Sequence, residues 1–179
     1  YLANLVRSRL HGNITYSNPN RHIHPTDVCV ASCRLCAYGK KAKDPKAYTM
    51  SLQQAWETAR SGWSEAVSEF HVVGGLHPFL TLDWYCELFR GLKQRHPRVH
   101  LKALTMVEVG YLAERSGLST LETLRKLKEA GVDSLPGGGA EIFSERVRRI
   151  ICDHKIGGGE WLRIAREAHS LGLHSNCTM

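Results

Sequence analysis

The sequence has no long apolar run and no secretory signal at its start. No segment of the 179 residues approaches the roughly 18 consecutive apolar residues that a membrane span needs. No basic stretch followed by an apolar one opens the chain. We therefore expect a cytoplasmic protein with no membrane partner. Because the chain begins at Tyr1 rather than at Met, the missing signal excludes little.

Linkers, low-complexity segments and concentrated basic patches are also missing. The formal net charge of +7 comes from scattered basic residues, and only Lys40, Lys41 and Lys43 are clustered. Scattered basic residues of this kind most often belong to a solvated surface. A second interpretation is that they attract a substrate with a carboxylate or phosphate group. Without an aromatic-rich basic patch or an RNA-binding extension, we expect no nucleic-acid partner. One domain is expected, and its oligomeric state is not readable from the sequence.

Cysteines are few and unevenly spaced. Cys29, Cys33 and Cys36 lie within eight positions, in "CVASCRLC". The other three stand singly, at Cys86, Cys152 and Cys177. Cysteines this close in a cytoplasmic-looking chain more often bind metal or act in redox chemistry than form disulfides. With no fourth thiol nearby, a closed site would need another ligand. Zinc held by the three cysteines and His22 or His24 is the structural alternative.

A short apolar run, a loop with glycine or cysteine and an amphipathic helix follow one another repeatedly. The runs expected as strands are 22–26, 69–75, 99–105, 132–136 and 173–179. Each intervening helix supplies the crossover that parallel neighbours require, so an α/β fold with a parallel sheet is predicted. Residues 1–12 are expected to form a helix ahead of this core, which spans residues 13–179.

Capping boxes mark two of the helices. Ser51 with Gln54 and Ser119 with Glu122 are pairs of the kind that closes a helix N-terminus. Apolar spacing predicts further helices around residues 85–92, ending by Pro97, and around residues 143–150 and 161–168. The helix that follows "PGGGAE" is expected to begin near Ala140 and to point its positive end back at that loop.

Three loops end strands at one rim, where parallel α/β folds collect their functional residues. They are the cysteine loop, "GGLHP" and "PGGGAE". Gly74 and Gly75 would let a ligand approach the backbone without meeting a Cβ. Gly137 and Gly138 would expose backbone N–H groups toward an anion or a ribose. An ordinary flexible turn is the alternative for both glycine loops.

The C-x3-C-x2-C spacing resembles the cluster loop of the radical S-adenosylmethionine (SAM) superfamily. The resemblance implies a [4Fe-4S] cluster held by Cys29, Cys33 and Cys36, with SAM on the open iron. An electron from the cluster then cleaves SAM to a 5'-deoxyadenosyl radical, and a donor such as flavodoxin or ferredoxin supplies the electron. The implied fold is a partial (β/α)6 barrel, TIM-like. With five strand candidates, the chain is expected to be truncated after the fifth strand.

The same resemblance implies roles for individual residues around SAM. Tyr38 would lie beside the adenine and Gly74–Gly75 beside the methionine amino group. Glu141 would bind ribose hydroxyls, and Arg146 would face the methionine carboxylate or be a solvated helix residue.

Three polar residues are candidates for contact with the second substrate. His77 would donate a proton or hold a carboxylate, with a solvent-exposed loop histidine as the alternative. Thr105 and Asn176 follow the third and fifth strands. They would face the substrate or form turns.

Longer sequence segments resemble one family within this superfamily. "CVASCRLCAYG", "FHVVGGLHP", "HLKALT", "PGGGAEIFSERVR" and "HSNCTM" are similar to the aminodeoxyfutalosine synthase family of menaquinone biosynthesis. This implies a transferase that adds the adenosyl radical to 3-[(1-carboxyvinyl)oxy]benzoate, a small carboxylate, with rearrangement and decarboxylation to 6-amino-6-deoxyfutalosine. The alternatives are a cyclic dehypoxanthine futalosine synthase, a deazaflavin-forming radical enzyme, a tRNA-modifying radical enzyme and a zinc module.

Overall fold

The sheet is fully parallel and its strands follow chain order. In the computed structural model, which describes residues 1–61 and 63–178, the order is β1-β2-β3-β4-β5. The strands are β1 (Asn20–Ile23), β2 (Glu69–Val72), β3 (His100–Ala103), β4 (Ser134–Leu135) and β5 (His174–Ser175). Sequential order without a reversal is the winding of a (β/α) barrel rather than of a doubly wound sheet. The predicted α/β barrel-type fold is confirmed, although each strand is shorter than expected. Met179 lies outside the described residues.

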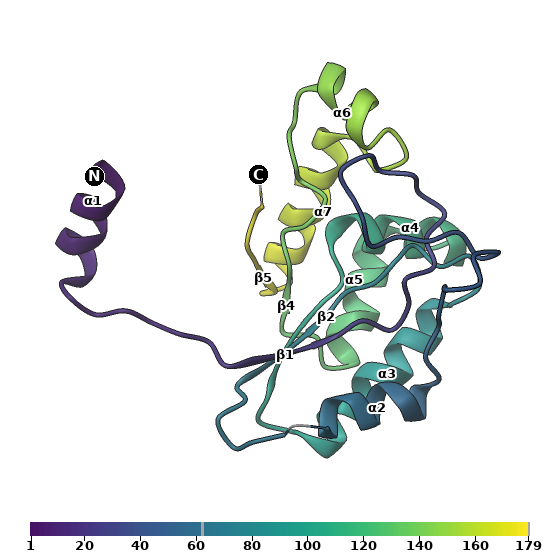
Figure 1. The fold of residues 1–179 in the computed structure, drawn as a ribbon, viewed down its shortest axis with the longest axis horizontal. Coiled ribbons are helices and arrows are strands. Elements are labelled where there is room, and N and C mark those ends of the chain that lie inside the picture. The colour runs from purple at the N-terminus through teal and green to yellow at the C-terminus, as the bar shows by residue number, and fades with distance from the viewer. Residues whose placement is uncertain (62, 179) are drawn as a thin grey trace.

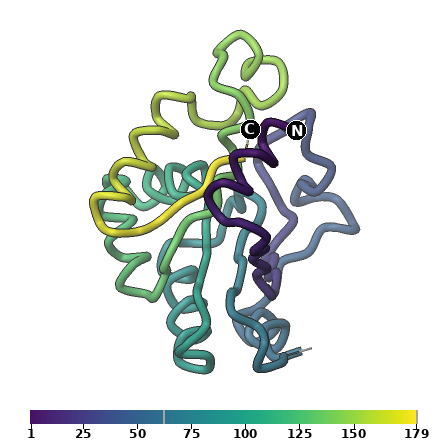
Figure 2. Tube along the Cα trace, turned by 90° about the vertical axis from the view of Figure 1, so that its left-hand side faces the viewer, coloured from purple at the N-terminus to yellow at the C-terminus, as the bar shows by residue number. Residues whose placement is uncertain are grey.

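The helices cover one face of this sheet. They are α2 (Leu52–Arg60), α3 (Leu82–Arg95), α4 (Met106–Ser116), α5 (Thr120–Glu129), α6 (Glu145–Ile151) and α7 (Gly158–Ser170). Figure 1 shows α2, α3, α5, α4 and α7 side by side in one layer, with α6 above them. Figure 2, turned by 90°, again places the light-green α6 segment at the upper end.

Two predicted capping boxes are confirmed, and a third was missed. Ser51 with Gln54 caps α2, and Ser119 with Glu122 caps α5. Thr105 with Glu108 caps α4, a helix that the sequence analysis did not predict. The expected helix start near Ala140 is wrong. α6 begins at Glu145, because residues 136–144 form an irregular loop whose carbonyl oxygens accept from Arg148 of α6.

The apolar core lies between the sheet and the helices. Phe70, Leu101 and Leu135 from the strands and Leu88 and Ile164 from the helices are almost fully buried. Alternate strand residues point to the opposite, concave face of the sheet, where the side chains are polar.

The helix α1 (Leu2–His11) stands apart from this core. Every residue in it is at least partly exposed, and Figure 1 shows it joined to β1 by an extended segment. No helix of the described residues is long and apolar enough to cross a lipid bilayer. The division at residue 12 stays a prediction.

Candidate functional site

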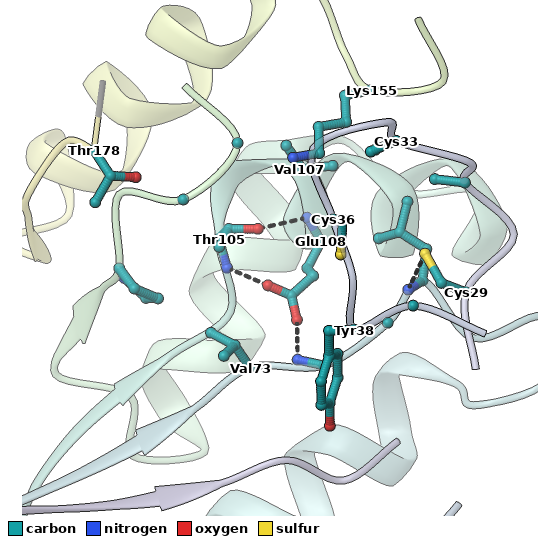
Figure 3. A pocket seen from close by; sticks show the side chains of 18 of the residues that line it. Cys29, Cys33, Cys36, Tyr38, Val73, Thr105, Val107, Glu108, Lys155 and Thr178 are labelled. Carbon is teal, nitrogen blue, oxygen red and sulfur yellow. Dashed lines mark hydrogen bonds between the residues drawn. The ribbon is translucent and has the colours of Figure 1, made fainter. Parts of the chain in front are cut away.

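A cavity of about 340 Å³ opens at the carboxyl ends of the strands. The cysteine loop and both glycine loops line it, as the sequence predicts, and Figure 3 shows them from close by. Its walls include most of the predicted site residues, namely Cys29, Cys33, Cys36, Tyr38, Gly74, Gly75, Thr105, Gly137, Gly138, Glu141 and Asn176. Residues more than 140 positions apart in the sequence therefore meet in one place.

A buried ion pair closes the base of the cysteine loop. The Asp27 carboxylate, 1% exposed, pairs with Lys40 and accepts a hydrogen bond from the Tyr48 backbone N–H at 2.7 Å. The Cys29 N–H donates to the Lys40 carbonyl at 2.8 Å, and the Lys40 N–H donates to the Asp27 carbonyl at 2.7 Å. The two ends of the loop are thus tied together beside the first cysteine.

The three thiols share one wall of the cavity. The Cys29 Sγ accepts a hydrogen bond from the Leu76 N–H at 3.3 Å, as a thiolate ligand would. A Cβ placed on Gly39 would lie 3.9 Å from the Cys29 Sγ and 4.0 Å from the Cys36 Sγ. The same Cβ would lie 3.2 Å from the Cys29 Cβ, so glycine at this position lets the chain pass close to two of the cysteines. This donor set fits an iron–sulfur cluster with one iron left free for another ligand.

His24 is engaged by contacts within the protein. Within residues 1–61 and 63–178, no three His, Cys, Asp or Glu side chains converge closely enough to form a metal site, and this holds for the three cysteine thiols as well as for His22 and His24. His24 instead donates from Nδ1 to the Val73 carbonyl at 3.0 Å and packs its ring 5.3 Å from that of Tyr38. The Tyr38 hydroxyl is hydrogen-bonded to the Tyr48 hydroxyl at 2.6 Å. These contacts give His24 a structural role beside the loop.

Both glycine loops need glycine because backbone approaches backbone. A Cβ on Gly75 would lie 2.2 Å from the Val28 carbonyl oxygen, and one on Gly137 would lie 2.0 Å from the Asn176 carbonyl oxygen. Neither distance is possible between real atoms. At these two positions the close approach comes from the neighbouring segment of the chain rather than from a ligand. Gly138 is different, since its Cβ would meet only a methyl group of Thr105, at 3.1 Å.

A buried glutamate, Glu108, holds the loop after β2. Its Oε1 accepts from the Gly74 N–H at 3.0 Å, and its Oε2 accepts from the Thr105 N–H at 2.7 Å (Figure 3). Burial raises the pKa of Glu108, while the two backbone donors oppose that shift. The sequence analysis missed this residue, although the Thr-x-x-Glu spacing of a capping box could have revealed it. Thr105 is thus a helix cap as well as a cavity residue.

The loop after β4 carries an ion pair. The Lys155 Nζ lies 2.8 Å from the Glu141 Oε1, and that oxygen also accepts from the Gly139 N–H at 3.2 Å. Glu141 adopts φ 52°, a left-handed conformation that is uncommon outside glycine and asparagine. Burial raises the pKa of the Cys33 thiol, and the ammonium of Lys155 opposes this shift. Lys155 was missed as a site residue, and nothing in the phrase "ICDHK" marks it.

A buried arginine, Arg148, fastens that loop to the rest of the site. Its guanidinium donates to the carbonyl oxygens of Gly139, Ala140, Ile142 and Ile156, at 2.5 to 3.2 Å. Arg148 is 3% exposed, whereas Arg146 points to solvent on the same helix. The structure therefore does not bring Arg146 to the cavity.

His77 also lies away from the cavity. Its Nδ1 accepts hydrogen bonds from the Phe79 and Leu80 N–H groups, both at 3.0 Å, which fixes the turn before α3. Burial first and Arg115 second lower the pKa of His77. The ring borders a separate, smaller cavity with Tyr85 and Tyr111. A proton-donating role at the main cavity has no support in this placement.

Comparison with known proteins identifies relatives over nearly the whole chain. The model of the Radical SAM superfamily matches residues 23–179. Aminodeoxyfutalosine synthase from Streptomyces coelicolor is 43% identical over 99% of this chain and 46% of its own length. The 5-amino-6-(D-ribitylamino)uracil–L-tyrosine 4-hydroxyphenyl transferase of Methanopyrus kandleri is 40% identical over 89% of this chain and 43% of its own length. The chain thus spans less than half of these relatives.

A solved structure supports the fold. The crystal structure of methylornithine synthase superposes with a TM-score of 0.74 at 17% sequence identity, covering 97% of this chain and 47% of that one. At this identity the likeness concerns the fold alone.

Proposed function

The chain belongs to the radical SAM superfamily, and we propose that it carries the cluster- and SAM-binding half of an aminodeoxyfutalosine synthase. The resemblance of the cysteine spacing to this superfamily is confirmed. The observation that carries the proposal is the meeting of three thiols and two glycine loops in one cavity. The 43% identity over 99% of the chain supports the specific reaction.

The superfamily implies a [4Fe-4S] cluster and SAM, a small-molecule substrate and an electron donor. Cys29, Cys33 and Cys36 would hold the cluster, since their thiols line one wall and Gly39 lets the chain pass close to two of them. When bound and reduced, the cluster supplies the electron that cleaves SAM to methionine and a 5'-deoxyadenosyl radical. A flavodoxin or ferredoxin would deliver that electron.

The remaining cavity residues would bind and orient SAM. Tyr38 offers an aromatic face, and Gly138 offers backbone that a ligand can approach. Glu141 would accept hydrogen bonds from ribose hydroxyls, while its partner Lys155 would attract the methionine carboxylate. Glu108 would keep the Gly74 segment in place, so that the radical forms at a fixed position.

In the proposed reaction the adenosyl radical adds to the enol-ether double bond of 3-[(1-carboxyvinyl)oxy]benzoate. Rearrangement and decarboxylation give 6-amino-6-deoxyfutalosine, and SAM is consumed as a substrate. The chain's part is to hold the alkene against the adenosyl group and to exclude water, which would otherwise compete for position in the cavity.

A second candidate has nearly as much support. The relative from Methanopyrus kandleri, a 4-hydroxyphenyl transferase, is 40% identical over 160 residues. Identities of 43% and 40% do not separate the two reactions. The products do, because only one of them retains the adenosyl group.

Electron paramagnetic resonance tests the proposal directly. We expect the anaerobically reconstituted, reduced protein to give a four-iron signal that changes on addition of SAM. Cys33→Ser should lose the signal, and Cys177→Ser, the same change at an exposed thiol, should keep it. Incubation with the enol ether should then yield an adenosyl-containing product. Retention of zinc in place of iron would overturn the proposal.

A further inference from the structure

The register of the parallel sheet aligns one polar row across all of its strands. Cα partners run from strand to strand through His22, His71, Lys102, Ser134 and His174. In β3 the residues on either side of Lys102, Leu101 and Ala103, are buried in the core. Because successive strand residues point to opposite faces, the row lies on the concave face, away from the helices.

Such a row is unusual for the inside of a parallel barrel. Branched apolar side chains normally fill that interior in layers. A histidine or lysine there loses hydration and needs a polar partner in return. Ser134 has one, since its hydroxyl lies 2.7 Å from the His100 Nε2. His71 and Lys102 keep 22% and 23% of their side chains exposed, and His71 forms part of the cavity wall.

Glu69, one layer deeper, only partly satisfies these two side chains. Its carboxylate lies 3.9 Å from the His71 Nδ1 and 3.6 Å from the Lys102 Nζ. Both distances exceed those of a direct hydrogen bond. The ammonium group has three N–H donors, so it retains capacity for a second anion. His22, exposed at the edge strand, stacks on His71 with ring centroids 4.7 Å apart.

His71 is uncharged at neutral pH. Burial first, and then the neighbouring His22, Lys102 and His24, lower its pKa to about 4, against the opposing effect of Glu69. A neutral imidazole donates one N–H without adding charge. Lys102 therefore supplies the positive charge of the row, and the two histidines supply directional hydrogen bonds.

We propose that His22, His71 and Lys102 form a subsite for the carboxylate of an aromatic substrate on the concave face of the sheet. The assignment rests on the proposed function, because the substrate named there carries a benzoate group. A carboxylate seated on this row places the rest of the molecule toward the cavity that His71 lines. The row thereby selects acidic aromatic substrates over neutral ones.

Calorimetric titration of the reconstituted protein with benzoate and benzamide tests this subsite. The two probes share a shape and differ in charge. We expect benzoate to bind about tenfold more tightly, as one charge-assisted hydrogen bond would produce. Lys102→Met should abolish the preference. Lys126→Met, the same change on the exposed side of α5, should leave it intact.

His22→Gln provides a second variant at an exposed position, where folding is not at risk. It should reduce the preference for benzoate while retaining the cluster signal. Equal binding of benzoate and benzamide to the unaltered protein would overturn the subsite, as would a preference that survives Lys102→Met. These binding measurements do not depend on the proposed radical reaction. A Lys102-dependent preference without an adenosyl product would leave the subsite standing and refute the proposed function.

Discussion

The two glycine loops of the cavity are held by opposite charges. After β2, the carboxylate of Glu108 accepts from backbone N–H groups, among them that of Gly74. After β4, the guanidinium of Arg148 donates to four backbone carbonyl oxygens, beginning with that of Gly139. Each loop therefore turns one kind of backbone group away from the cavity and toward a buried ion.

The difference indicates what each loop leaves free for a ligand. In the loop after β4, Arg148 occupies carbonyl oxygens, and the Gly139 N–H already donates to the Glu141 Oε1. An anion or a ribose oxygen would therefore bind other N–H groups of the loop or displace that contact. In the loop after β2, Glu108 occupies the Gly74 N–H and His24 occupies the Val73 carbonyl. The carbonyls of Gly74 and Gly75 are the ones left to accept from an ammonium group. The placement of the methionine amino group beside Gly74 and Gly75 stays a prediction.

Of the two buried ions, Arg148 should contribute more to the stability of the protein. Arg148→Met removes all four hydrogen bonds and leaves buried carbonyls without donors, so we expect the free energy of unfolding to fall by about 3–5 kcal/mol. Chemical denaturation measures it. Arg146→Met on the same helix is exposed and should change stability by less than about 0.5 kcal/mol. Equal losses in the two variants would contradict a special role for Arg148.

Replacing Glu108 should cost less, because fewer groups depend on it. Glu108→Gln turns an NH2 group toward one of two backbone N–H donors, and we expect a loss of about 2 kcal/mol. Denaturation of Glu114→Gln, an exposed change on the same helix, serves as the control. If the glutamine variant matched the unaltered protein in stability, a carboxylate would not be needed to hold this loop.

The stabilisation that Glu108 gives to the β2 loop should depend on pH, whereas that given by Arg148 to the β4 loop should not. Because burial raises the pKa of Glu108 above its ordinary value of 4.5, the folded protein binds this proton more tightly than the unfolded chain. The free energy contributed by Glu108 is then fully present below 4.5 and declines as pH rises toward the folded pKa. The stability gap to Glu108→Gln should shrink as pH rises above 4.5.

Arg148 gives the matching control for this pH series. An arginine side chain keeps its charge throughout the range, so the gap to Arg148→Met should stay constant. Denaturation curves of the three proteins at several pH values check both statements. A Glu108 gap that widened with rising pH would mean that the backbone donors outweigh burial.

Sequence patterns predicted the fold well because they record which face of each element is buried. Ser51 and Ser119 marked two helix starts, and the apolar runs located all of the strands in the described residues. The helix after Thr105 was missed, although its capping box has the same form. The start of α6 was misplaced because hydrogen bonds from the buried Arg148 side chain, rather than helix propensity, set the loop before it.

The site residues that follow a sequence motif could be predicted from the sequence. Those that depend on side-chain packing could not. The three cysteines and the glycine loops meet as expected, since all follow strands that end at one rim. Arg148 and Lys155 act through burial and through an ion pair across 14 positions, and no local pattern records that. Glu108 carries a local signal, the capping box with Thr105, but not the signal of its contact with Gly74. His77 and Arg146 had suitable chemistry but point elsewhere.

The mildest change, Gly138→Ala, separates a glycine kept for a ligand from one kept for the backbone. Its Cβ would meet only the Thr105 methyl group, at 3.1 Å, so the free energy of unfolding should fall by less than about 1 kcal/mol. The added methyl group would lie beside the cavity, where it should weaken SAM binding by about tenfold, measured by titrating the cluster signal. Unchanged SAM binding would assign Gly138 to the turn alone. The β4 loop would then contact SAM through Glu141 instead.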